Sequence, residues 1–213
     1  MATRVVVAGA GGRMGARIIN LIVASGDMTL SGALEREGFT ALGDDAGQAS
    51  GVGPLGIPFT SDDSSLEGDV IISFAIPVAS LSHASLAAEK GMGIVIGTTG
   101  FTPAESEALA QIGEKIPCVH APNMSVGVNA AFRLIEEAAR LLGDGYDVEV
   151  LETHHNQKID APSGTAVRMG EILARTLGRD YPPRTNRSSL KGNQAQAGRY
   201  CSCRDIDRRS HTT

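Results

Sequence analysis

The chain of 213 residues contains no Trp, and aromatic residues make up only 4% of it. This scarcity disfavours an aromatic-rich β-sandwich and a base-stacking surface for nucleic acid. The formal net charge of −5 also argues against a nucleic-acid partner, because binding to a phosphate backbone requires a concentrated positive surface. A small-molecule ligand is therefore the expected partner.

Cysteines and long apolar runs are scarce as well. The three cysteines, Cys118, Cys201 and Cys203, form no pattern typical of a disulfide framework and suit a reducing compartment. No metal site is predicted, since Cys201 and Cys203 lack a partner cluster and the adjacent histidines His154 and His155 lack the i, i+4 spacing of a helical zinc pair. No run approaches the roughly 18 apolar residues of a membrane span, and no signal-peptide core precedes the first strand. We expect a cytoplasmic protein.

Glycine is abundant instead, with 26 residues, and 42% of the chain is hydrophobic, which is enough to fill the core of a large domain. Short β-branched runs alternate with segments that carry apolar residues at helical spacing. This alternation predicts an α/β fold with a Rossmann-type, doubly wound parallel sheet and right-handed crossovers. The expected strands lie at 4–8, 29–34, 69–74, 92–96 and 117–121, the expected helices at 16–24, 79–90 and 103–115, and a surface loop at 39–57.

The first expected strand ends in the glycine-rich turn Gly9-Ala10-Gly11-Gly12-Arg13-Met14-Gly15. A strand, a glycine turn and a helix in this order are the context of a dinucleotide-binding motif, in which glycines let the backbone approach a pyrophosphate. The spacing departs from the strict G-x-G-x-x-G pattern, because Met14 occupies the place of its last glycine. The turn alone would also suit close packing of strand and helix without a ligand.

Two further segments favour the dinucleotide hypothesis. Glu35 follows Gly15 by 20 residues at the end of the second expected strand, where an acidic side chain can bind ribose hydroxyls. Arg36 could hold a 2′-phosphate, so the pair permits NADH or NADPH, and a solvated charged turn is the alternative. The segment Gly97-Thr98-Thr99-Gly100 ends another strand, at the sheet edge that meets ligands in this fold.

A domain boundary is expected at the Pro/Asn/Gly-rich segment 122–129, which precedes a long helix at 130–142. Polar and apolar residues then alternate over 147–152, which is typical of a half-exposed strand and would open a second, antiparallel sheet. We therefore divide the chain into a dinucleotide-binding domain (1–122), a partial substrate-binding domain (123–184) and an atypical tail (185–213).

Reactive side chains are most concentrated in the segment 151–166, which contains two imidazoles, an ammonium, carboxylates and a hydroxyl. Ser163 is a good N-cap for a helix that continues to Gly178. The backbone N–H groups of Gly164 and Thr165 would then lie at the positive end of the helix dipole, where an anion is stabilised. Lys158 could add a full positive charge, so the segment predicts a carboxylate or phosphate site with its own acid–base groups.

Taken together, these motifs resemble the dihydrodipicolinate reductases of bacterial lysine and diaminopimelate synthesis. The resemblance covers roughly residues 4–184, and the His154-His155-x-x-Lys158-x-Asp160-Ala-Pro-Ser-Gly-Thr165 signature is far more specific than the glycine turn. It implies a Rossmann domain that binds NADH or NADPH, a substrate domain that closes over it, and a homotetramer assembled through the second sheet. The implied reaction is hydride transfer to a cyclic imine dicarboxylate, from 4-hydroxy-tetrahydrodipicolinate to tetrahydrodipicolinate.

The resemblance also implies roles for single residues. Gly164 and Thr165 would hold one substrate carboxylate, Lys158 would neutralise it and donate a proton to the ring, and His154 would be the hydrogen-bonding or general-acid partner. His155 would face the other side of the substrate or support the pocket. The residues expected to line the cofactor are Gly9, Gly12, Arg13, Met14, Gly15, Glu35, Arg36, Phe74, Gly97, Thr98, Thr99, Ala121, Asn123, Met124 and Ser125.

Two departures from the family pattern are apparent. Ser73-Phe74-Ala75 stands where the family usually has Asp-Phe-Thr, which removes a hydroxyl near the cofactor. The tail, 185–213, is rich in Arg and Ser without apolar periodicity, as in a disordered segment or translation in a shifted frame, and suggests a premature end. A catalytically impaired NAD(P)-binding fragment is therefore one alternative to an active reductase. An unrelated NAD(P) dehydrogenase acting on another small acid is the other.

Overall fold

A computed structural model describes residues 1–154, 162–179, 184–189 and 199–204, the last two ranges by their backbone alone. The chain divides into two compact units, Met1–Pro122 and Asn123–Thr213. Within the described residues, no helix is long and apolar enough to cross a membrane.

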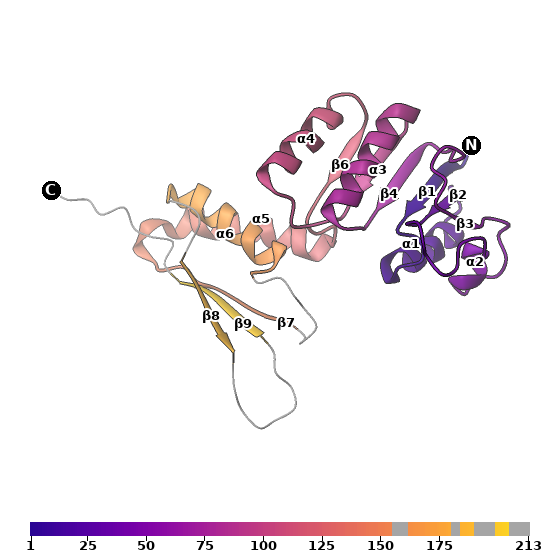
Figure 1. Ribbon diagram of the computed structural model, residues 1–213. Coiled ribbons are helices and arrows are strands. Elements are labelled where there is room, and N and C mark those ends of the chain that lie inside the picture. Colours follow the sequence, from indigo (N-terminus) through magenta and orange to yellow (C-terminus); the bar gives the residue numbers. More distant parts are fainter. Residues whose placement is uncertain (155–161, 180–183, 190–198, 205–213) are drawn as a thin grey trace, which may run out of the picture. The chain divides into compact units, whose positions relative to one another are not determined.

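The first unit contains a six-stranded parallel sheet with the strand order β3-β2-β1-β4-β5-β6 (Figure 1). This is the order of a classic dinucleotide-binding fold, in which the chain crosses to the other half of the sheet after β3. The predicted Rossmann-type sheet is therefore confirmed. Its strands are β1 (Thr3–Ala8), β2 (Met28–Leu34), β3 (Phe59–Thr60), β4 (Val70–Ser73), β5 (Gly93–Ile96) and β6 (Cys118–His120).

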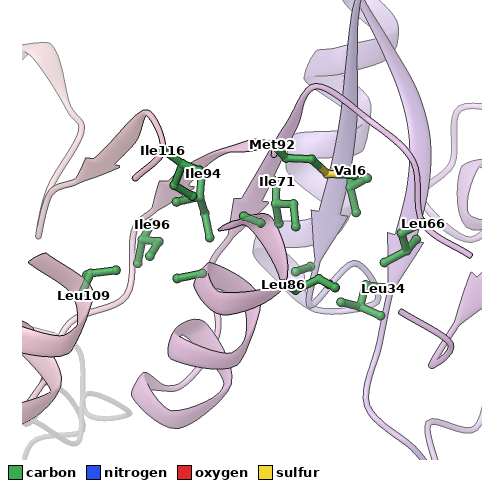
Figure 2. Close-up of a cluster of buried hydrophobic side chains, with 13 residues drawn as sticks. Val6, Leu34, Leu66, Ile71, Leu86, Met92, Ile94, Ile96, Leu109 and Ile116 are labelled. Atoms are coloured by element: carbon green, nitrogen blue, oxygen red, sulfur yellow. The ribbon is translucent and has the colours of Figure 1, made fainter. Parts of the chain in front are cut away.

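Helices cover both faces of this sheet, because side chains along a strand alternate between its faces. On β1, Val5 and Val7 pack with Ile19 of α1. Val6 belongs to the core on the opposite face (Figure 2), as does Ala8. That opposite core also contains residues from α3 and α4, so the sheet is doubly wound. The four helices of this unit are α1 (Arg13–Ala24), α2 (Ala46–Ala49), α3 (Pro77–Lys90) and α4 (Pro103–Gly113).

Local signals set most helix ends. Gly91 ends α3 with a φ of +67°, and Thr102 forms a capping box with Glu105 at the start of α4. Helix α1 begins at Arg13, earlier than expected, because the glycine turn itself completes the strand-to-helix connection. The expected loop at 39–57 contains the short helix α2, which Asp45 caps by accepting a hydrogen bond from the Gln48 N–H.

The second unit contains α5 (Val126–Leu142), a 3₁₀ turn (Gly143–Gly145), β7 (Val150–His154), α6 (Gly164–Leu177), β8 (Arg184–Ser189) and β9 (Arg199–Arg204). Helices α5 and α6 lie side by side (Figure 1), and Ala139 of α5 packs with Leu173 and Ala174 of α6. The three strands form an antiparallel sheet in the order β7-β9-β8, which confirms the predicted second sheet.

Strands β8 and β9 correct one expectation. The tail was predicted to be disordered because it lacks apolar alternation, yet 184–189 and 199–204 pair with each other and β9 pairs with β7. Backbone pairing with a neighbouring strand needs no apolar periodicity, so the sequence pattern gave no sign of it. The other residues of the predicted tail lie outside the described residues.

A buried chain of polar side chains connects the ends of β4 and β5 to α3. Ser73 Oγ lies 2.9 Å from His83 Nδ1 and 3.3 Å from Ser80 Oγ. Ser80 Oγ lies 2.6 Å from Thr98 Oγ1, which donates to the Ala75 carbonyl at 2.9 Å. Ser73 and Ser80 are fully buried and Thr98 is 5% exposed, so these hydroxyls depend on one another for hydrogen bonds.

The environment of His83 makes the stability of the first unit depend on pH. Burial lowers the pKa of the His83 imidazole, and the Glu35 carboxylate offsets part of this effect. The unfolded chain, with an imidazole pKa of about 6.5, binds a proton more readily than the folded one. The free energy of unfolding should therefore decrease as the pH falls through about 6.5 towards the lower pKa of the folded state.

We predict that His83→Asn, which keeps a polar atom near Ser73 but cannot titrate, makes this decrease smaller. Urea unfolding of both proteins at intervals from pH 7.5 to 5.5 measures it. Above pH 7 the two curves should differ by a constant amount, because the imidazole is neutral in both states there. An equally steep decrease in the variant would contradict the assignment.

Candidate functional site

The carboxyl ends of three central strands lie at one level of the first sheet. Ala8 pairs with Ser73, and Ser73 pairs with Ile96, so β1, β4 and β5 end together. The residues that follow are Gly9, Phe74 and Gly97, all expected to line a cofactor. Ligands of open parallel sheets bind outside such strand ends, next to the point where the strand order reverses. The structure therefore brings these three residues to the expected place.

Phe74 explains why position 97 is a glycine. A Cβ at Gly97 would lie only 2.0 Å from the Phe74 ring, so the ring packs directly on this backbone. Ala121 follows β6 at the same edge and donates its N–H to the Ile96 carbonyl at 3.2 Å. The two neighbouring threonines differ: Thr99 is exposed, whereas the Thr98 side chain is buried and its Oγ1 contacts Ala75 and Ser80. Of the two hydroxyls, only that of Thr99 faces solvent.

The glycine turn has the geometry that close approach of a phosphate requires. Gly9 has a φ of +72°, and its carbonyl accepts from the Gly12 N–H at 3.1 Å. A Cβ at Gly15 would lie 2.3 Å from the Gly9 carbonyl oxygen, so only glycine lets α1 start this close to the turn. Gly12, the N-cap, offers no side chain to the first N–H groups of α1, and Arg13 and Met14 are exposed. Such a helix start can accept an anion.

Glu35 lies beside this turn. Its carboxylate accepts from the Gly11 N–H at 2.9 Å and from the Arg36 N–H at 3.1 Å, so the end of β2 is fixed to the turn. Arg36 is exposed. Phe39, which was not expected at this site, packs against the glycine turn as well. A Cβ at Gly11 would lie 2.2 Å from the Phe39 ring.

These observations test whether a nicotinamide dinucleotide fits. A glycine turn that a Cβ would block, an uncapped helix start and a carboxylate at the end of β2 are the features that a pyrophosphate and a ribose require. The residues present therefore fit the cofactor.

In the second unit, the start of α6 has the predicted cap. Ser163 is 3% exposed, and its Oγ accepts from the Ala166 N–H at 3.1 Å. Gly178 ends the helix with a φ of +62°. The described part of the chain provides no recorded acceptor for the N–H groups of Gly164 and Thr165, as expected for an anion site.

Glu152 of β7 was missed as a member of this group. Its carboxylate accepts from the Ser163 N–H at 2.7 Å and from the Ser163 hydroxyl. The carboxylate therefore fixes the cap residue to β7, two positions before His154. The sequence contains no local sign of this contact, because the two residues are 11 positions apart and the spacing matches no capping motif.

A second network lies at the start of the second unit. Asn123 Oδ1 accepts from the Ser125 N–H at 2.9 Å, and its Nδ2 donates to Thr165 Oγ1 at 3.2 Å. Asn123 and Ser125, both expected at the cofactor, thus lie in one network with Thr165, expected at the substrate. Met124 between them is exposed.

Three predicted residues cannot be placed by their side chains. His155 and Lys158 lie outside the described residues, and His154 is described only as the last backbone position of β7. In the portion of the chain that is described, no group of His, Cys, Asp and Glu could hold a metal ion.

Comparisons with known proteins agree with this arrangement. Residues 3–124 match the family model of the dihydrodipicolinate reductase N-terminus, and residues 127–209 match that of its C-terminus. The second match continues well past residue 184, where the resemblance in the sequence analysis ends.

Individual relatives carry the same name. The 4-hydroxy-tetrahydrodipicolinate reductase of Anaeromyxobacter dehalogenans is 52% identical over 179 residues, which is 83% of this chain and 66% of that protein. The reductase of Syntrophotalea carbinolica is 49% identical over 197 residues, covering 92% of this chain and 72% of that protein. This chain thus spans 66% to 72% of the length of these two relatives.

A solved structure is similar as well. The dipicolinate-bound dihydrodipicolinate reductase from Paenisporosarcina sp. TG-14 superposes with a TM-score of 0.62 at 25% identity, over 91% of this chain and 74% of that chain. On the strength of the two matched family models and of these relatives, the chain belongs to the dihydrodipicolinate reductase family.

Proposed function

We propose that this chain is an NAD(P)H-dependent reductase of a cyclic imine dicarboxylate, 4-hydroxy-tetrahydrodipicolinate, in lysine and diaminopimelate synthesis. The observation that carries the proposal is the start of α6. There the backbone N–H groups of Gly164 and Thr165 lie beside the Thr165 hydroxyl, whose oxygen already accepts a hydrogen bond from Asn123. Donors in this arrangement suit a carboxylate. The names of the relatives supply the identity of the dicarboxylate.

The first unit would hold the cofactor, and the bound nicotinamide supplies the hydride. The start of α1 would face the pyrophosphate, and Glu35 would accept hydrogen bonds from ribose hydroxyls. Arg36, which follows Glu35 in the chain, and Arg13 in the glycine turn are both exposed, which supports use of either NADH or NADPH. Gly97, Thr99 and Ala121 would approach the nicotinamide from the strand ends, with Met124 and Ser125 from the segment after Pro122.

The acid–base chemistry falls to the segment between β7 and α6. In the conversion of 4-hydroxy-tetrahydrodipicolinate to tetrahydrodipicolinate, the ring loses its hydroxyl as water and gains a hydride on carbon and one proton. Lys158 would donate that proton to the ring while its charge holds the substrate carboxylate. His154 would support it as a hydrogen-bonding or general-acid partner, and His155 would line the substrate pocket. These roles rest on the family signature, in which the residues match position by position.

Assembly and location belong to the same proposal. The antiparallel sheet β7-β9-β8 is the element through which the family resemblance implies a homotetramer. A cytoplasmic location is expected from the few cysteines and from a reaction that uses the cellular pool of reduced nicotinamide. The small-molecule substrate is the partner expected of such a reductase.

Gly15→Ala tests the cofactor half. The new methyl group would meet the carbonyl oxygens of Gly9 and Ala10 and push α1 away from the turn, so NADH and NADPH affinity should fall about ten-fold or more. Fluorescence titration of the reduced cofactor measures this. Gly26→Ala is the matched control, because nothing lies within 4 Å of a Cβ there. Equal affinities in both variants would contradict the placement of the pyrophosphate.

Lys158→Met tests the substrate half. Turnover should fall by roughly 100-fold or more, because the proton donor and the charge on the carboxylate are both removed, while NADPH affinity stays near normal. Steady-state NADPH oxidation and fluorescence titration give the two quantities. The planar pyridine-2,6-dicarboxylate should compete strongly with substrate in the parent protein. Equal loss of turnover and cofactor affinity would refute the role of Lys158, and absence of competition would favour another small-acid dehydrogenase.

A further inference from the structure

The orientation of the Asn123 amide is determined by its neighbours. The Ser125 backbone N–H can only donate, and it lies 2.9 Å from one terminal atom of the Asn123 side chain, which must therefore be the oxygen. The other terminal atom is then the NH₂ group, and it faces Thr165 Oγ1 at 3.2 Å. Asn123 is consequently a donor to the Thr165 hydroxyl.

This contact determines what the Thr165 hydroxyl can offer a ligand. Because Oγ1 accepts a hydrogen bond from Asn123, its own proton points elsewhere and is available for donation. The backbone N–H of Thr165 lies in the first turn of α6 and is also a donor. Thr165 therefore presents two donors, and an acceptor such as a carboxylate oxygen suits them better than an ammonium or an amide N–H would.

Helix α5 fixes the backbone of Asn123 through hydrogen bonds from Asn129. Asn129 Nδ2 donates to the Asn123 carbonyl at 3.0 Å and to the Ser125 carbonyl at 2.9 Å. The segment 123–125 is thus attached at its backbone to α5 and at its side chain to α6. Such double attachment reduces the freedom of the amide, so its donor stays directed at Thr165.

We propose that Asn123 is a positioning residue for the substrate carboxylate, holding the Thr165 hydroxyl as a donor, and not a direct contact of the cofactor. The inference rests on the proposed function, since it assigns a ligand to Thr165. It changes the role expected for Asn123 from the sequence. It also makes substrate selection depend on a residue that does not touch the substrate.

The test uses the full chain saturated with NADH and pyridine-2,6-dicarboxylate as the probe, with calorimetry giving its dissociation constant. Asn123→Ala should weaken probe binding about five-fold, the value of one neutral hydrogen bond, and leave NADH affinity unchanged. Asn123→Asp should weaken it more, because a carboxylate would accept the Thr165 proton and repel the anionic probe. If Asn123 had a purely structural role, Asn123→Asp would not weaken probe binding more than Asn123→Ala does.

A double-variant cycle completes the test. In a Thr165→Val background, Asn123→Ala should cause no further loss of probe binding, because the hydroxyl that it orients is gone. Thr176→Val, the same change near the other end of α6, should leave probe binding as in the parent chain. Equal probe binding in Asn123→Ala and the parent, or loss of NADH affinity instead, would overturn the proposal. Failure of the unmutated, NADH-loaded chain to bind the probe would instead overturn the proposed function.

Discussion

The first backbone N–H groups of a helix have no acceptor within the helix, and both halves of the proposed site depend on this constraint. Helix α1 starts after Gly12, which has no side chain to cap it, and its first turn is free to receive a pyrophosphate. Helix α6 starts after Ser163, whose hydroxyl accepts from the Ala166 N–H and donates to Glu152, while the N–H groups of Gly164 and Thr165 have no acceptor among the described residues. The same feature, an uncompensated helix start, occurs once in each unit and would provide the two proposed anion sites.

The remaining structure keeps these helix starts in place. In the first unit, the register of β1, β4 and β5 brings the carboxyl ends of these strands to one level. The hydrogen-bonded hydroxyls from Ser73 through Ser80 to Thr98 connect the ends of β4 and β5. In the second unit, Glu152 fixes Ser163 and Asn123 orients Thr165. Neither the Glu152 carboxylate nor the Asn123 amide needs to contact a ligand, yet each determines which hydrogen-bond donors are directed at the ligand.

Local patterns were sufficient to predict much of this architecture. The Ser163 cap and the Gly178 stop of α6 follow from signals within a few residues, and both are confirmed. The doubly wound parallel sheet also follows from repeated strand–helix alternation. The roles of His154, His155 and Lys158 stay predictions, since their side chains lie outside the described residues.

Contacts between distant segments could not be predicted in this way. The approach of His83 to Ser73, of Glu152 to Ser163 and of Asn123 to Thr165 depends on the topology, which brings together residues 10, 11 and 42 positions apart. Thr98 looked like a ligand contact because it ends a strand, but burial turns its hydroxyl to Ala75. Strands β8 and β9 were missed because they pair through their backbones, β9 with β7 and β8 with β9, and their sequences lack the apolar alternation on which strand prediction relies.

The central claim is that one chain delivers a hydride to a dicarboxylate held at α6. Oxidation of NADPH and NADH by the purified 213-residue chain, with the cyclic substrate formed in situ by the enzyme that precedes it in the pathway, tests this claim most directly. Turnover should depend on the substrate-forming enzyme, and pyridine-2,6-dicarboxylate should suppress it. Cofactor binding without any turnover would contradict it, and would leave a nucleotide-binding chain that has lost its chemistry.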